Sequence, residues 1–170
     1  MKLKENIFTT LLLAIGLILH YITPGILGGM KFDFLLVFIF ASLLLNSKFE
    51  NIILTALLGG LLSAMTTTFP GGQIPNMIDK MVTCLLMYFV INFFKKRDLN
   101  IITLAIIGAL GTFISGMTFL TSALCITGLP VPMPLLVTGI VIPTVVVNTV
   151  AIVFVYKALK SAVMRFGISI

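Results

Sequence analysis

The sequence predicts an all-α integral membrane protein, a single bundle of six transmembrane helices with both termini in the cytoplasm. Of the 170 residues, 59% are hydrophobic and 9% are charged, and the mean hydropathy is +1.23. A soluble domain carries about 25% charged residues, so most of this surface must face lipid. The apolar residues form six runs, and the basic residues gather at alternate ends of those runs.

The six apolar runs define the expected helices of one membrane domain, 1–170. They cover residues 7–22, 32–46, 52–68, 74–94, 101–127 and 135–159. The first run follows the basic stretch MKLKEN, as in a signal peptide, but no small-residue cleavage site follows, so we expect a retained helix. The second is shorter than the roughly 20 residues of a straight span and carries Asp33 near its start. We expect it to be short or tilted, or covered by its neighbours.

The positions of the basic residues predict the orientation. With a cytoplasmic N-terminus, nine basic residues lie on the inner side, and Lys31 and Lys80 lie on the outer side or at outer helix ends. This excess follows the positive-inside rule. The inner residues are Lys2, Lys4, Lys48, Lys95, Lys96, Arg97, Lys157, Lys160 and Arg165. The loops around 23–31, 69–76 and 127–134 then face outward.

Those outer loops are rich in glycine and proline, as in TPGILGGMKFD, FPGGQIPN and TGLPVPMP, whereas the inner connections NSKFEN and KKRDLN are brief and charged. Glycine and proline favour defined turns. We therefore expect the outer loops to form a shaped surface that carries the function. No internal repeat is evident, so the sequence does not support a transporter built from inverted halves.

Small residues form stripes on single faces of the expected helices. The stripes are Ala56, Gly60 and Ala64 on the third helix, Gly108, Thr112 and Gly116 on the fifth, and the shorter pair Thr10 and Ala14 on the first. Small residues let helix backbones approach closely in lipid. We expect the two longer stripes to pack inside the bundle, with docking onto another membrane protein as the alternative.

Polar side chains at membrane depth are few, and such groups are costly in lipid unless they pair or face water. They are His20, Lys31, Asp33, Gln73, Asn76, Asp79, Lys80 and Asn148. We interpret them as candidate substrate-binding residues, because polar groups at this depth commonly serve function. For His20 and Asn148, a hydrogen bond between helices is an equally good interpretation.

Asn76, Asp79 and Lys80 fall on one helix face because of their spacing. A structural interpretation is a helix that begins at Pro75, with Asp79 near its positive end and Lys80 reaching toward the membrane surface. A functional interpretation is that these residues and Gln73 line an outward-facing pocket. The residues by themselves leave both open.

A zwitterionic ligand with an aromatic body would suit such a pocket. Its carboxylate would bind Lys80, Lys31 or the N–H groups of a helix start, and its ammonium would bind Asp79 or Asp33. Apolar walls at comparable depth would come from Phe69, Met117, Phe119 and Tyr21.

The sequence offers little for catalysis. It has one histidine and five acidic residues, and it shows no Walker-type loop, zinc-binding spacing or Gly-x-Ser-x-Gly motif. We expect no catalytic residue, no metal site, no cofactor and no ATP binding by this chain. The membrane explains the basic residues at helix ends, so nucleic acid is not an expected partner.

The stretch LLSAMTTTFPGGQIPNMIDK at 61–80 resembles the signature region of the TrpP-type tryptophan transporters. These are substrate-binding S components of energy-coupling factor (ECF) transporters. Four other stretches agree: LH at 19–20, GGMKFD at 28–33, SGMTFLTSAL at 115–124 and LPVPMPLLVTGIVIPTVVVNTVA at 129–151. The resemblance runs through nearly all of the chain.

The resemblance implies a bacterial cell-membrane protein that captures L-tryptophan with high affinity outside the cell and releases it inside. Energy would come from a transmembrane coupling subunit and two ATPase subunits, while the S component topples within the bilayer. S components usually dock through an Ala-x-x-x-Ala motif on helix one. Here the nearest match is Thr10-x-x-x-Ala14, a departure from the motif.

Two alternatives stay open at this point. The chain could be an S component for another small aromatic compound or a vitamin, with the same fold and partners and a different pocket. It could also be a structural or regulatory membrane subunit without a ligand, in which the outer loops only turn the chain.

Overall fold

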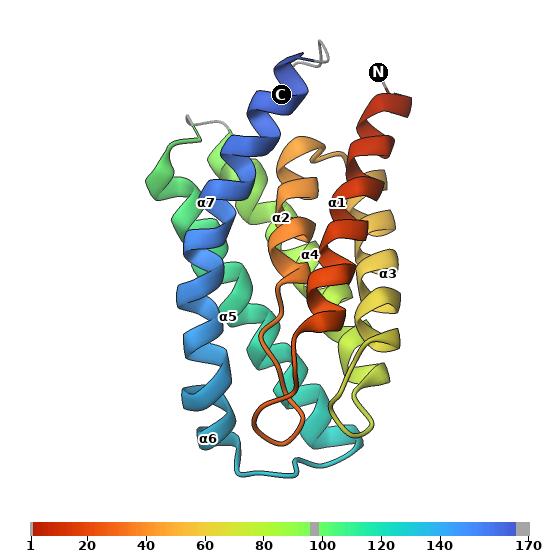
Figure 1. The fold of residues 1–170 in the computed structure, drawn as a ribbon, viewed down its shortest axis with the longest axis vertical. Coiled ribbons are helices and arrows are strands. Elements are labelled where there is room, and N and C mark those ends of the chain that lie inside the picture. Colours follow the sequence, from red (N-terminus) through yellow and green to blue (C-terminus); the bar gives the residue numbers. More distant parts are fainter. Residues whose placement is uncertain (1, 96–98, 166–170) are drawn as a thin grey trace.

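The computed structural model describes residues 2–95 and 99–165, with only the backbone described for residues 2–5. These ranges form six helical segments (Figure 1). The first five are α1 (Lys2–Ile22), α2 (Leu35–Leu45), α3 (Phe49–Met65), α4 (Gln73–Lys95) and α5 (Ile101–Ile126). The sixth is continuous and consists of α6 (Met133–Leu136), a π-helical turn (Val137–Val141) and α7 (Ile142–Arg165).

The distribution of side chains confirms the predicted class of multi-pass helical membrane protein. By length and composition, α4, α5 and the segment Met133–Arg165 can each cross a bilayer, and Asn6–Ile22, α2 and α3 are shorter apolar helices. Large apolar side chains such as Leu11 and Phe154 are exposed on the outside of the bundle, while Asp79 and Lys80 are buried. This arrangement inverts that of a soluble protein, as a lipid environment requires.

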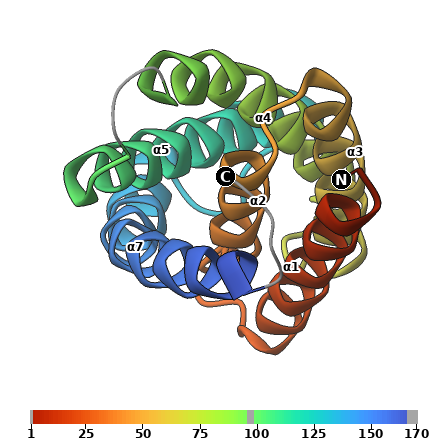
Figure 2. The same ribbon diagram turned by 90° about the horizontal axis from the view of Figure 1, so that it is seen from above.

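Helix α2 lies at the centre of the bundle and is surrounded by the other helices when the molecule is seen from above (Figure 2). All 11 of its residues are buried. At about 1.5 Å per residue it is much shorter than the roughly 30 Å of hydrocarbon that a spanning helix crosses. Protein rather than lipid surrounds it, so irregular backbone is tolerated at its ends. A short segment covered by its neighbours is one of the forms that the sequence predicted.

The start of α2 differs from the expected one. Residues 32–34 are not helical, so Asp33 belongs to the preceding connection. The Asp33 carboxylate accepts a hydrogen bond from the backbone N–H of Leu36 at 3.3 Å. A side chain that satisfies a first-turn N–H lies before the helix rather than in it, and apolar periodicity does not reveal this boundary.

Three connections lie at one end of the bundle, and the start of α1 and the end of α7 lie at the other end (Figure 1). We call these connections the cap loops: residues 23–34, 66–72 and 127–132. Thr68 Oγ1 donates a hydrogen bond to the Gly29 carbonyl at 2.7 Å. Gly29 has a φ of 81°, and a Cβ there would collide with the Thr68 carbonyl. Gly28 likewise lies against Pro130. The first cap loop therefore contacts both of the others.

The sixth segment continues through Pro143 because the turn before it widens. Proline has no N–H to donate, and the backbone N–H of Ile142 bonds to the Val137 carbonyl in the π-helical pattern. Val141 and Thr144, on either side of Pro143, line the cavity described below. The segment extends beyond the expected range of 135–159 at both ends.

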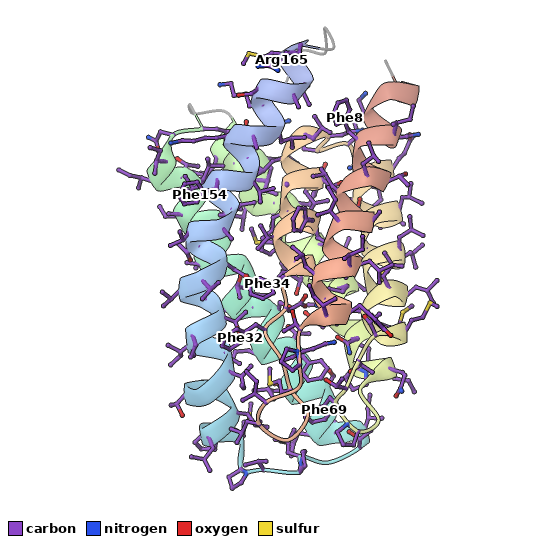
Figure 3. All side chains as sticks on the ribbon, viewed as in Figure 1. Phe8, Phe32, Phe34, Phe69, Phe154 and Arg165 are labelled. Atoms are coloured by element: carbon purple, nitrogen blue, oxygen red, sulfur yellow. The ribbon has the colours of Figure 1, made fainter. Side chains whose placement is uncertain are left out.

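We expect Phe40→Ala to lower the thermal unfolding midpoint of the detergent-solubilised protein far more than Phe154→Ala. Phe40 is 1% exposed on α2, whereas Phe154 is 69% exposed and points away from the bundle (Figure 3). Loss of a buried phenyl ring costs about 3–5 kcal/mol of unfolding free energy, whereas detergent fills the space that the Phe154 ring vacates. Equal midpoints for the two variants would contradict the central position of α2.

Candidate ligand-binding cavity

The bundle contains a buried cluster in which one ammonium binds two carboxylates. Lys80 on α4 is 0% exposed, and its Nζ donates to Asp33 Oδ2 at 2.5 Å, to Asp79 Oδ2, and to Ser115 Oγ at 3.5 Å. An ammonium has three protons, so these bonds use all of them. Asp33 comes from the first cap loop and Ser115 from α5, so the cluster joins three parts of the fold. Lys80 therefore does not reach toward the membrane surface.

Asp79 is held by hydroxyl groups as well as by Lys80. Its Oδ1 accepts from Thr83 Oγ1 and its Oδ2 from Ser115 Oγ, both at 2.9 Å. With both carboxylates ionised, Asp33 and Asp79 carry two negative charges, which the Lys80 ammonium and the nearby Lys31 ammonium balance. Buried charge is costly without a partner, so the two lysines allow both carboxylates to be ionised.

Lys31 ties the first cap loop to two helix ends. Its Nζ donates to the backbone carbonyls of His20 and Thr66, each at 2.7 Å. These carbonyls lie in the last turn of α1 and at the C-cap of α3, where unpaired carbonyls and the helix dipole attract cations. Burial lowers the pKa of the Lys31 ammonium, and the nearby Asp33 carboxylate opposes that effect. One N–H of Lys31 is left for another partner.

Asn148 supports the site from α7. Its Nδ2 donates to the Asp33 backbone carbonyl at 3.0 Å and to Thr112 Oγ1 at 3.3 Å. The side chain is 1% exposed. Asn148 therefore fixes the backbone of Asp33 against α5 and α7, which is the interhelical role that the sequence left open for it.

A cavity lies between the charged cluster and the cap loops. It is lined by His20, Gly29, Met30, Lys31, Asp33, Leu36, Thr67, Phe69, Asn76, Asp79, Thr112, Ser115, Gly116, Phe119, Val141 and Thr144. Phe69 and Phe119 form an edge-to-face pair with ring centroids 5.2 Å apart. Phe69 lies at the cap-loop end of the bundle (Figure 3). The cavity thus combines charged groups with an aromatic wall.

The cavity is too small for a large ligand as it stands. Its volume is about 50 Å³, whereas a single water molecule needs roughly 10–15 Å³. An organic molecule with a bicyclic ring therefore enters only if the lining moves. The first cap loop supplies Met30, Lys31 and Asp33 to the lining, so a ligand of that size would displace part of this loop.

The structure brings most of the predicted site residues together. His20, Lys31, Asp33, Phe69, Asn76, Asp79 and Phe119 line the cavity, and Lys80 and Asn148 bind the lining residue Asp33. Gln73 does not line it, because it is the exposed first residue of α4. Met117 is also absent from the lining, since one residue along a helix turns the side chain by about 100° from Gly116. Tyr21 is 74% exposed and does not line the cavity, because it is one residue along the helix from the lining residue His20.

Apart from Phe119, the residues of α5 that line the cavity were not predicted as ligand contacts. Thr112, Ser115 and Gly116 line the cavity, although Thr112 and Gly116 belong to a stripe that the sequence suggested for helix packing. The stripe both packs against neighbouring segments and lines the cavity. Gly108 packs against α7, and a Cβ at Gly116 would meet Val141. The sequence feature that could have predicted this wall is the pair Thr112 and Ser115, because their spacing of three puts two hydroxyl groups on the same face of the helix.

A multi-pass helical protein with a small internal cavity that carries charges and aromatic rings has the features of a membrane protein that binds a small polar molecule. The family model described as "Tryptophan transporter TrpP" matches residues 2–165. The chain belongs to this family, as its sequence motifs predicted. It is accordingly a bacterial membrane transport protein rather than an enzyme.

Curated relatives cover nearly the full chain. A protein of Clostridium acetobutylicum named "Probable tryptophan transport protein" is 42% identical over 162 residues, which is 95% of each chain. One of Bacillus subtilis with the same name is 39% identical over 165 residues, which is 97% of this chain and 95% of the relative. No solved structure matches the chain.

We expect Lys80→Met to destabilise the protein strongly, because it leaves the Asp33 and Asp79 carboxylates buried without their ammonium. Breaking a buried ion pair by removal of one partner costs roughly 3–5 kcal/mol. Lys157→Met, at an exposed position on α7, is the matched control. The thermal unfolding midpoint in detergent is measured for both variants. Adding Asp79→Asn to Lys80→Met should recover part of the lost stability. A Lys80→Met midpoint equal to that of the control would show that the cluster does not stabilise the fold.

Proposed function

We propose that this chain captures L-tryptophan with high affinity in the cavity and is the substrate-binding S component of an ECF-type transporter. The observation that carries the proposal is a cavity inside the bundle with carboxylates, an ammonium and an aromatic wall. Membership of the tryptophan transporter family supports the ligand. The cap loops would face the outside, as the positive-inside distribution of basic residues favours.

The lining groups suit the three parts of tryptophan. The indole ring would lie against Phe69 and Phe119, because aromatic pairs prefer offset or edge-to-face contacts. The carboxylate would lie near Lys31, since the three protons of Lys80 are already bound to protein acceptors. Asn76 lines the cavity and bonds to Gly72 through Nδ2, so its carbonyl oxygen can accept a hydrogen bond from the ligand. Gln73 would contribute only if the cap loops rearrange.

Energy for uptake would come from partner subunits. The sequence has no Walker-type motif, so ATP hydrolysis would belong to two ATPases joined through a transmembrane coupling subunit. Thr10 and Ala14 are exposed on the lipid-facing side of α1. Small residues at such a position allow another helix to approach closely. We assign this face to docking of the coupling subunit.

We expect the purified protein in detergent or nanodiscs to bind L-tryptophan saturably and D-tryptophan at least about tenfold more weakly, because fixed polar groups discriminate by geometry. The chain contains no tryptophan, so indole fluorescence reports on the ligand alone. Asp79→Asn should weaken binding, whereas Lys157→Met should not. Failure of the folded protein to bind L-tryptophan saturably would overturn the proposed ligand.

We expect uptake, unlike binding, to require the partner subunits. Tryptophan accumulation in proteoliposomes should appear only when the coupling subunit, both ATPases and ATP are present. A Thr10→Leu, Ala14→Leu double variant should keep tryptophan binding and lose accumulation, because the bulky side chains block close helix approach. Accumulation by this chain alone would contradict the S-component mechanism, and normal accumulation by the double variant would contradict the docking face.

A further inference from the structure

The hydrogen bonds around His20 favour one position for its ring proton. Thr66 Oγ1 lies 2.7 Å from the Leu62 carbonyl and 2.7 Å from His20 Nδ1. A hydroxyl has a single proton, so both contacts are hydrogen bonds at once when Thr66 donates to Leu62 and His20 Nδ1–H donates to Thr66. A neutral imidazole protonated at Nδ1 presents an unprotonated acceptor at Nε2.

The unprotonated nitrogen faces a carboxylate oxygen across a gap. His20 Nε2 lies 3.9 Å from Asp33 Oδ1, which is well beyond the 2.7–2.9 Å of a charge-assisted hydrogen bond. A proton shared between these two atoms would shorten that distance. His20 is 3% exposed, and an imidazole buried this deeply stays uncharged unless it is paired. The ring is therefore an acceptor that points at another acceptor.

Neither acceptor has a strong donor among the residues that the structure describes. Asp33 Oδ1 accepts the long 3.3 Å bond from the Leu36 N–H, while Lys80 binds the other carboxylate oxygen. Lys80 has no proton left to give, and Lys31 directs two of its three to backbone carbonyls. Both His20 and Asp33 line the cavity, so a ligand is able to reach the gap.

We propose that the gap between His20 Nε2 and Asp33 Oδ1 binds the ammonium group of the ligand. A nitrogen set back into the cavity at about 2.8–2.9 Å from each atom satisfies both acceptors at once. Its positive charge also lies beside the Asp33 carboxylate. This assignment rests on the proposed function for the indole part of the ligand, and it adds the orientation that the family membership does not supply.

A substrate class follows from this orientation. The ammonium meets two acceptors, one of them a carboxylate, whereas the carboxylate meets one N–H of Lys31. The ammonium is therefore the main anchor, and the cavity is selective for aromatic amines. Tryptamine lacks only the carboxylate and indole-3-propionate lacks only the ammonium, so the two compounds separate the contributions.

The test is a direct fluorescence titration of the unmodified protein with L-tryptophan, tryptamine and indole-3-propionate. We expect tryptamine to bind within about tenfold of tryptophan and indole-3-propionate to bind at least about a hundredfold more weakly, because each missing bond leaves a buried acceptor unpaired. Binding of indole-3-propionate as tight as that of tryptamine would overturn the assignment. Binding of tryptamine without tryptophan would support it and overturn the proposed function, and binding of neither amine would overturn both.

A variant pair separates ligand contact from a structural role of His20. His20→Phe keeps the ring and removes Nε2, whereas Thr66→Val removes the His20–Thr66 bond and keeps Nε2. We expect His20→Phe to weaken tryptamine binding by about tenfold or more and to leave that of indole-3-propionate unchanged. Thr66→Val should weaken tryptamine binding less, because the bound ammonium itself selects the tautomer in which Nε2 is unprotonated. Equal weakening of tryptamine binding by the two variants would show that His20 acts only through the fold and would overturn its ligand role.

Discussion

A lysine ammonium that is fully buried in a membrane bundle is the constraint on which the rest of the site depends. Lys80 can be ionised there only because Asp33, Asp79 and Ser115 surround it. Asp33 must then reach the cluster from a connection rather than from a helix, and Asn148 holds its backbone carbonyl from α7. The position of the first cap loop, the late start of α2 and the polar face of α5 all follow from satisfying one cation.

The shortness of the central helix α2 is linked to the same cluster. A helix of 11 residues cannot cross the bilayer alone, but α2 has neighbours on every side (Figure 2). Its shortness leaves room at one end for the irregular cap loop that delivers Lys31 and Asp33. Non-helical backbone at this depth is tolerated where protein or a polar cavity surrounds it. The cavity therefore occupies the space that a full-length central helix would fill.

The sequence predicted the membrane class, the segment count and most of the cavity-lining polar residues, because charge at membrane depth is rare and therefore informative. It did not predict that Lys80 is saturated by protein acceptors, since the partners Asp33 and Ser115 lie 47 and 35 residues away along the chain. The small residues on α5 predicted packing, and composition cannot separate a packing face from a cavity wall. Gln73 and Met117 were predicted as ligand contacts but do not line the cavity, because residue type alone does not say which way a side chain points.

The cavity would select its ligand in two unequal ways. The Phe69 and Phe119 wall recognises a ring by shape, and a shape contact distinguishes neighbouring apolar groups by only about 1–3 kcal/mol. The acceptors at His20 and Asp33 discriminate far more strongly, because a ligand without an N–H donor leaves both of them buried and unpaired. His20 is 3% exposed, so bulk water has little access to replace the missing donor. The burial of these acceptors therefore sharpens the distinction between an amine and an acid of the same ring.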